Sequence, residues 1–326
     1  MLRRTALLGL GALAARPALA AYPERLVTMV TGYSPGGSTD ILARLLTDPL
    51  AGQFGAGTRI AVENRPGASG VVASDWLRRQ PADGYLMMVA ETGSHGIAPN
   101  ALVGGTRYNP VEDFTHLGVL GAPPLVLIVT NAFPGRSAAE IVERLRSSPL
   151  DSLTYATSGV GGVLHLASEM LAQHLGTRFV HVPYRSGAQM LQSIHTGEAQ
   201  FGIAAIASAA AQMRDGLVRP VAVTGLRRSA AFPDIPTLAE NGVPGFEFDS
   251  WYVMVGPAGI PVPVAETING ALRTCLAQPE LRQKLLGAGH EAWDRPNSLE
   301  DARSFMAREV AKYRDIVART GIRLSP

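Results

Sequence analysis

Short runs of apolar and β-branched residues recur along the chain, and each is followed by small residues and then by apolar residues at helical spacing. In the first such unit, residues 26–31 predict a buried strand and residues 41–46 predict a helix. The repeated order of strand, glycine-rich loop and helix is typical of parallel α/β architecture. Ligands bind such sheets at the carboxyl ends of the strands, so the loops there are the candidate binding elements.

The same pattern continues to the end of the chain. Strands are expected at residues 59–64, 85–90, 125–130, 153–156, 179–184, 201–203 and 221–224, and as a long strand at 246–256. Helices are expected at residues 71–79, 137–147, 163–175, 185–195, 264–276, 280–286 and 299–320. The pair Pro123-Pro124 marks a crossing between two domains.

The loop at residues 32–40, GYSPGGSTD, predicts an anion site. Gly36 and Gly37 let the backbone approach a ligand, and Ser38 is of a type that caps helices. The first N–H groups of a helix have no intrahelical partner and lie at the positive end of its dipole. We expect this loop to hold a carboxylate, with Asp40 bonding the N–H groups of its own loop.

Two other functions fit parts of this loop. Residues 32–36 match the G-x-S-x-G nucleophile elbow, so the alternative function is an exported serine hydrolase that uses Ser34. However, the residue after an elbow serine donates its N–H to the oxyanion, and Pro35 has none. A phosphate loop of the Walker type would need a lysine where this loop has Ser38.

Three later loops share this small-residue composition, at residues 65–70, 91–96 and 157–162. The last one precedes a helix, so Thr157 and Ser158 would lie at a second helix N-terminus facing the first, and the two would hold an anion from both sides. It does not match a dinucleotide loop, because no acidic residue follows about 20 residues later.

Two side chains near the second loop are candidates for further roles. His165 is either a structural hydrogen-bonding group or a ligand contact, and it shares a helix face with Glu169. No third metal ligand is evident, so no metal is expected. Arg185 is the one cation beside a candidate loop, and it would pair either with a ligand carboxylate or with a protein acid.

The first 20 residues predict an export signal that is cleaved after Ala20. They combine Arg3 and Arg4 with a short apolar run and an A-x-A site, and the run ends far short of the roughly 20 residues that span a bilayer. Both the general and the twin-arginine export routes stay open. The chain has 29 Lys+Arg and 27 Asp+Glu. Cleavage removes three arginines, which leaves 26 minus 27, or −1. This balance lacks the basic excess that nucleic-acid binding needs, and the single cysteine, Cys275, forms no internal disulfide.

Six motifs in order resemble the Bug family, the extracytoplasmic substrate-binding proteins of tripartite tricarboxylate transporters. They are Tyr22-Pro23, YSPGGSTD at 33–40, ENRPGASG at 63–70, YATSGVGG at 155–162 with His165, VPYR at 182–185 and FPDIPT at 232–237. The resemblance implies a type II periplasmic-binding-protein fold with two α/β domains, two crossovers and an enclosed carboxylate. The domains would be residues 21–123 plus 249–326 and residues 124–248.

The resemblance also implies a periplasmic receptor, not an enzyme, that hands a di-, tri- or aromatic carboxylate to membrane transporter subunits without a cofactor. We expect a monomer. In the family, the loops matching residues 33–38, 68–69 and 157–161 hold the ligand. The chain departs from the family at Gly162, where a hydroxyl residue is usual, and residues 204–207 lack the aspartate with which some members would bind an amino group. The expected ligand contacts are Tyr33, Ser34, Gly36, Gly37, Ser38, Ala68, Ser69, Thr92, Ser94, Thr157, Ser158, Gly159, Gly161, His165 and Arg185.

Overall fold

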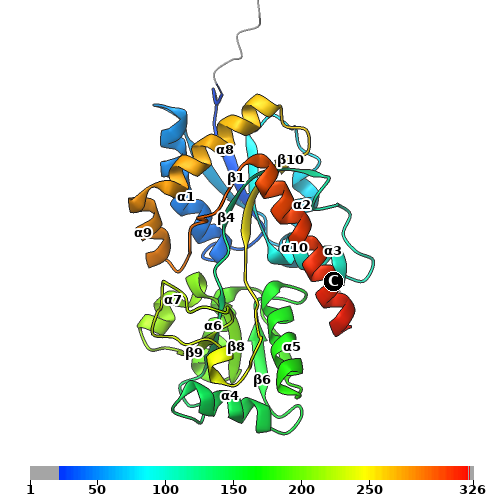
Figure 1. Cartoon of the computed structure of the whole chain (residues 1–326), viewed down its shortest axis with the longest axis vertical. Coiled ribbons are helices and arrows are strands. Elements are labelled where there is room, and N and C mark those ends of the chain that lie inside the picture. The colour runs from blue at the N-terminus through cyan, green and yellow to red at the C-terminus, as the bar shows by residue number, and fades with distance from the viewer. Residues whose placement is uncertain (1–21, 322, 324–326) are drawn as a thin grey trace, which may run out of the picture.

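Two five-stranded sheets lie one above the other along the long axis of the molecule (Figure 1). The structure is a computed structural model that describes residues 22–321 and 323. The predicted signal segment, residues 1–20, lies outside this part of the chain. None of the helices in the described residues is long and apolar enough to span a membrane.

The first sheet has the order β2-β1-β3-β10-β4. Strands β1, β2 and β3 are parallel. Strand β10 comes from the other half of the chain and runs antiparallel between β3 and β4. The strands are β1 (Val27–Thr31), β2 (Ile60–Asn64), β3 (Leu86–Glu91), β4 (Phe114–Gly121) and β10 (Tyr252–Pro257). Its helices are α1 (Ser38–Phe54), α2 (Val71–Leu77), α3 (Ala98–Ala101), α8 (Val262–Ala277), α9 (Pro279–Gly287) and α10 (Leu299–Thr320).

The second sheet repeats this plan with the order β7-β6-β8-β5-β9. Here β5 is the antiparallel strand that enters from the other half. The strands are β5 (Leu125–Val129), β6 (Thr154–Thr157), β7 (Val180–Pro183), β8 (Phe201–Ala205) and β9 (Arg219–Val223). The helices are α4 (Ala138–Ser147), α5 (Val163–Leu175), α6 (Gly187–Thr196) and α7 (Ile206–Arg214).

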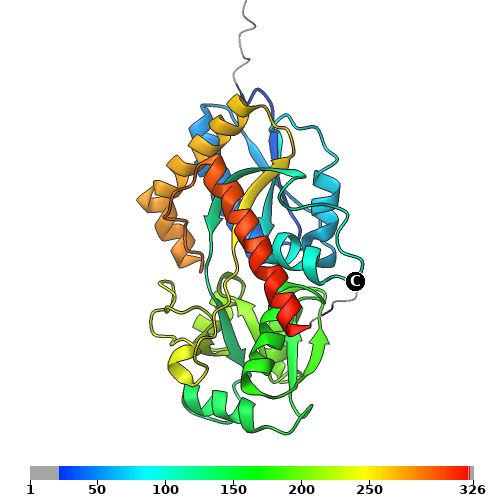
Figure 2. The ribbon, with the colours of Figure 1, turned by 45° about the vertical axis from the view of Figure 1, so that its right-hand side comes forward.

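The chain crosses between the sheets twice, and the two crossings lie side by side. Pro124 and Asp249 form an antiparallel bridge, and Ser250 N donates to Pro123 O at 3.0 Å. The paired crossings are a natural hinge, because few backbone angles change when the sheets rotate about them. Helix α10 extends from the first sheet toward the second (Figure 2), and its Tyr313 hydroxyl donates to Asp249 O at 3.2 Å.

Two sequence predictions differ from the observed strands. The long strand predicted at residues 246–256 is wrong in its first half, since β10 begins at Tyr252. Phe248 N instead donates to Thr224 O at 3.0 Å, so this half forms the second crossing. Strand β4 was not predicted, because His116 and Gly118 interrupt its apolar run.

Candidate functional site

A cavity of about 630 Å³ lies between the two sheets. It is lined by the loops that follow β1, β2, β6, β7 and β8, as expected for carboxyl ends of parallel strands. Most of the predicted ligand contacts line this one cavity: Tyr33, Ser34, Gly36, Gly37, Ser38, Ala68, Ser69, Ser158, Gly159, His165 and Arg185.

The N-terminus of α1 opens into the cavity, but its glycine amides are already bonded. Gly36 N donates to Asp40 Oδ2 at 2.9 Å, and Gly37 N donates to Ser34 O at 3.2 Å. The first helical bond runs from Ile41 N to Gly37 O at 2.9 Å. The amides of residues 38–40 therefore have no partner in the described chain, and they are the donors available to an anion.

Asp40 bonds its own loop, which confirms the role expected for it. The buried carboxylate accepts from Gly36 N and from Asn64 Nδ2, at 2.9 Å each, and pairs with Arg44. Burial alone would raise the pKa of Asp40, but Arg44, Gly36 and Asn64 outweigh it and lower the pKa. The carboxylate is fully occupied and holds the loop in shape.

The N-terminus of α5 repeats this arrangement on the opposite side of the cavity. Gly161 N donates to His165 Nδ1 at 3.2 Å, four residues apart as in the pair of Gly36 and Asp40. The first helical bond runs from Leu166 N to Gly162 O at 3.1 Å. The amides of residues 163–165 therefore also have no partner in the described chain. Two helix N-termini of like construction thus line one cavity.

Two neutral histidines hold the second loop. Burial lowers the pKa of His165, so Nδ1 stays free to accept from Gly161. His165 stacks on His181 at a centroid distance of 4.0 Å, and burial lowers the pKa of His181 to about 4. His181 Nε2 lies 2.7 Å from Thr157 Oγ1, which donates to Gly159 O at 2.8 Å. His165 therefore bonds its own loop, and it also lines the cavity.

The loop after β2 reaches across the cavity to the loop before α5. Ser69 has φ +52°, a left-handed conformation that is uncommon for a residue other than glycine. Its hydroxyl lies 3.4 Å from Val160 O. A Cβ at Gly162 would lie 2.9 Å from Ser69 Oγ, so the absence of a side chain there permits this approach. The two halves of the molecule thus touch at the cavity.

Four predicted contacts do not line the cavity: Thr92, Ser94, Thr157 and Gly161. Thr92 and Ser94 are fully buried in a helical turn, Thr92–Ile97, rather than exposed on a loop. Thr92 Oγ1 accepts from Trp251 N at 2.9 Å, and Ser94 N donates to Glu91 Oε1 at 3.0 Å. Glu91, the last residue of β3, caps this turn, and both side chains are buried away from the cavity.

The sequence did not identify several groups of the cavity. Thr39 Oγ1 and Tyr184 Oη belong to cavity-lining residues, are buried and have no hydrogen-bond partner in the described chain. Buried hydroxyls are normally bonded, so these two are exceptions among the described residues. The sequence offered two signals for these residues. Thr39 is of a type that caps helices, and Tyr184 directly precedes the candidate Arg185.

Charged groups are few in the cavity. The guanidinium of Arg185, which lines the cavity, forms no ion pair with a protein acid in the described residues. Glu91 also lines the cavity but accepts from Tyr33 Oη at 2.7 Å, and from Gly93 N and Ser94 N. The Tyr33 hydroxyl is therefore committed to Glu91, and what Tyr33 offers a ligand is its ring and backbone.

The groups needed for other chemistries do not come together here. Ser34 Oγ bonds no histidine in the described chain, and Pro35 supplies no oxyanion donor. The described residues contain no group of three His, Cys, Asp or Glu side chains that is able to hold a metal ion.

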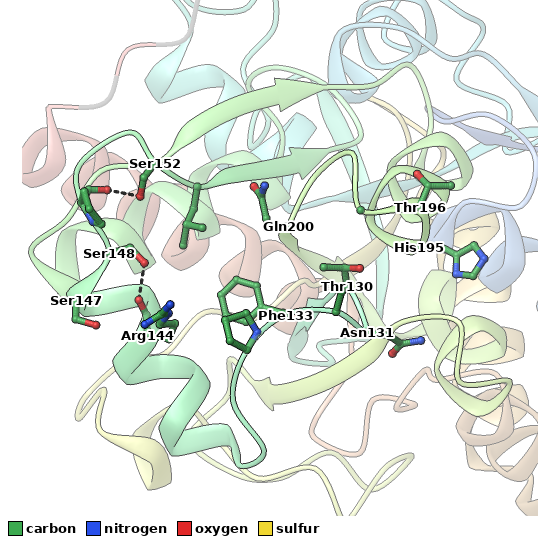
Figure 3. Close-up of a pocket in the computed structure, with 15 residues that line it drawn as sticks. Thr130, Asn131, Phe133, Arg144, Ser147, Ser148, Ser152, His195, Thr196 and Gln200 are labelled. Atoms are coloured by element: carbon green, nitrogen blue, oxygen red, sulfur yellow. Dashed lines mark hydrogen bonds between the residues drawn. The ribbon is translucent and has the colours of Figure 1, made fainter.

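A second cavity, of about 650 Å³, lies at the other end of the strands of the second sheet (Figure 3). It is lined by residues before β6 and β8, such as Ser152 and Gln200. Its serines bond backbone carbonyls: Ser148 Oγ donates to Arg144 O at 2.6 Å and Ser152 Oγ to Pro149 O at 2.7 Å (Figure 3). Size therefore does not separate the two cavities, but the free helix amides belong to the first one.

The chain is similar to known proteins over most of its length. Residues 42–322 match the model of the tripartite tricarboxylate transporter family receptor. Protein BugT of Bordetella pertussis is 26% identical over 93% of this chain and 91% of its own. A solved R. palustris protein with adipate has a TM-score of 0.87 at 30% identity and covers 94% of this chain and 100% of its own. MatC from Rhodopseudomonas palustris with bound malate has a TM-score of 0.82 at 30% identity, covering 91% and 100%.

These matches agree with the two-sheet fold. They also confirm the Bug resemblance that was drawn from the sequence motifs. The chain belongs to the tripartite tricarboxylate transporter receptor family, the Bug family of periplasmic solute-binding proteins.

Proposed function

We propose that this receptor captures a small carboxylate in the cavity between its sheets and delivers it to the membrane subunits of a tripartite tricarboxylate transporter. The observation that carries the proposal is the pair of helix N-termini, α1 and α5, with unbonded amides at one cavity. Hydrogen bonds to a charged group contribute about 1.5–3 kcal/mol each. Three to five of them therefore supply the roughly 8 kcal/mol of micromolar binding. The related structures contain adipate and malate, which are small carboxylates.

The proposal includes how the chain is built and used. The domains are residues 21–123 plus 249–326 and residues 124–248, with the paired crossings as the hinge. The signal segment is removed after Ala20, and the exported protein acts as a monomer that binds and does not catalyse. Ligand closure would bring Ser69 against the loop at Gly162, the contact that the structure has across the cavity.

A thermal-shift and calorimetry panel with adipate, malate and benzoate tests the proposal, using two matched variants. Gly36 and Gly176 have φ +79° and +68°, and a Cβ at either would meet no atom within 4 Å. Gly36→Val and Gly176→Val therefore introduce similar backbone strain, the first at the cavity and the second at the end of α5.

At least one carboxylate is expected to raise the melting temperature of the wild type and of Gly176→Val, and to raise that of Gly36→Val much less. The proposal fails if no carboxylate raises the melting temperature, or if both variants respond as the wild type does.

A further inference from the structure

The two halves of the molecule also touch where the second-sheet helix α7 lies beside the end of α9 (Figure 1). Arg214, the last residue of α7, donates from Nη2 to Gly287 O at 2.8 Å. Glu291 Oε1 accepts from Ser229 Oγ at 2.7 Å and from Ala230 N at 3.0 Å. We call these five residues the clasp. Gly287 and Glu291 belong to the half that contains the first sheet, and the other three belong to the half that contains the second sheet.

The second-sheet side of the clasp is held in place by its own half of the molecule. The guanidinium of Arg214 lies over the ring of Phe232, 5.1 Å from the ring centroid. Ser229 O accepts from Phe232 N at 3.2 Å, and Ser229 Oγ accepts from Ala231 N at 3.2 Å. The donors on this side are therefore preorganised independently of the first-sheet half.

The first-sheet side is fixed just as firmly, against the end of β4. A Cβ at Gly121 would lie 2.2 Å from Glu291 O, so the missing side chain permits this approach. Two residues further on, Trp293 N donates to Leu120 O at 3.0 Å. Gly287 is the last residue of α9, where helix carbonyls have no intrahelical donor and the dipole favours a cation. A guanidinium therefore suits this position.

The clasp lies outside the ligand cavity. Among the described residues that line the cavity, none belongs to the clasp, although Ser208 of α7 does line it. Between the clasp and the cavity the two halves are closely packed, since a Cβ at Gly289 would lie 2.8 Å from Ala207 N. The clasp therefore has no contact with a ligand in the cavity, and it acts on binding only through the position of the two halves.

We propose that the clasp stabilises the closed arrangement of the two halves, so that Arg214 and Glu291 set ligand affinity without contacting the ligand. This inference rests on the proposed function and adds positioning residues to it. Rotation about the paired crossings separates groups that belong to different halves, so the clasp contacts are lost when the cavity opens. A ligand that binds the closed arrangement supplies the free energy of closing, and the clasp reduces that amount.

Loss of the clasp should weaken different ligands by the same factor, because no ligand touches it. Glu291→Ala removes the acceptor of two hydrogen bonds and is expected to weaken adipate and malate about tenfold each. Arg214→Met removes one hydrogen bond at an exposed side chain and is expected to weaken both about threefold. Since closure follows the encounter with the ligand, the dissociation rate should rise while the association rate stays unchanged.

Titration calorimetry and stopped-flow fluorescence of the mature protein with adipate and malate test this, with two control variants. Glu291→Gln keeps a side-chain oxygen that accepts the same two hydrogen bonds, so its affinities should stay within about twofold of the wild type. Arg228 is another exposed arginine, but it donates to Pro233 O at 3.2 Å and pairs with Glu240, both inside the second-sheet half. Arg228→Met should therefore bind both ligands as the wild type does.

Amide hydrogen exchange at Ala230 reports on the clasp directly. Adipate should slow the exchange of this amide in the wild type and should not slow it in Glu291→Ala.

The inference is overturned if Glu291→Ala and Arg214→Met bind as the wild type does, or if they weaken adipate and malate by different factors. It is also overturned if the Ala230 amide is equally protected without ligand, because the clasp would then be a permanent tie. In each of these cases the wild type still binds a carboxylate and the proposed function stands. If the wild type binds neither carboxylate, the proposed function fails together with the inference.

Discussion

Closure of the cavity depends on the missing side chain at Gly162, and the variant Gly162→Ser tests this. Gly162 is the N-cap of α5, with φ −86° and ψ 178° and no side-chain cap. A serine fits this conformation and caps the helix, so the unliganded protein is expected to gain a few tenths of a kcal/mol. The added Cβ, however, would lie 2.9 Å from Ser69 Oγ and 3.5 Å from Ser69 Cβ in the closed arrangement.

The contact with Ser69 sets the expected size of the effect on binding. An ordinary contact needs about half an ångström more, so either Ser69 changes rotamer or the two halves close less far. Overpacking of this kind costs about 1–3 kcal/mol. Ligand affinity should therefore fall roughly 5- to 150-fold while the melting temperature without ligand rises slightly.

A double-mutant cycle with Ser69→Gly isolates the contact. Glycine suits the left-handed conformation of residue 69 and removes both atoms that the new side chain meets. In titration calorimetry, the affinity loss caused by Gly162→Ser should be much smaller in the Ser69→Gly background. An equal loss in both backgrounds, or no loss in either, would refute the reasoning.

Three further changes have distinct expected results. Thr39→Val removes an unpartnered buried hydroxyl, so affinity should fall about tenfold with no loss of melting temperature, and an unchanged affinity would contradict a role for this hydroxyl. Arg185→Gln should weaken the binding of adipate roughly fivefold and leave that of hexanoate, which has one carboxylate, unchanged in calorimetry, whereas equal losses would show that the guanidinium does not bind the additional carboxylate of adipate. His290→Leu removes a histidine whose pKa burial lowers to about 4. The unfolded chain binds this proton below pH 6.5 and the folded chain does not, so stability falls as pH falls from 6.5. Between pH 6.5 and 5 the variant should lose about 1.5 kcal/mol less than the wild type in denaturant titrations, and parallel losses would be inconsistent with a neutral buried imidazole.

Elements with strong local signals were predictable from the sequence. Helix α10 spans Leu299–Thr320 as predicted, because Ser298 and Asp301 form a capping box at its start. Helix α5 likewise spans the predicted residues 163–175 and ends at Gly176 in the left-handed conformation. These boundaries depend on neighbouring residues alone.

The functional details of the cavity depend on specific side-chain contacts, some between near neighbours in the sequence and some between distant residues. The glycine-rich loops were identified, but which amides stay free is decided by the side chains of Asp40 and His165, which bond Gly36 and Gly161. Similarly, Ser94 is buried in the turn that Glu91 caps, and Glu91 also accepts a hydrogen bond from Tyr33, which is distant in the sequence. Local propensity carries no information about such pairings.

The central claim is that a carboxylate is held by free amides at two helix N-termini, and amide chemical shifts in a ligand titration test it most directly. With adipate added to isotope-labelled protein, the account predicts that the largest amide shifts occur at residues 38–40 and 163–165. Gly36 and Gly161, whose amides are already bonded within the protein, should shift less. Shifts confined to the other cavity, around Phe133 and Gln200, with none at the two helix N-termini, would contradict it.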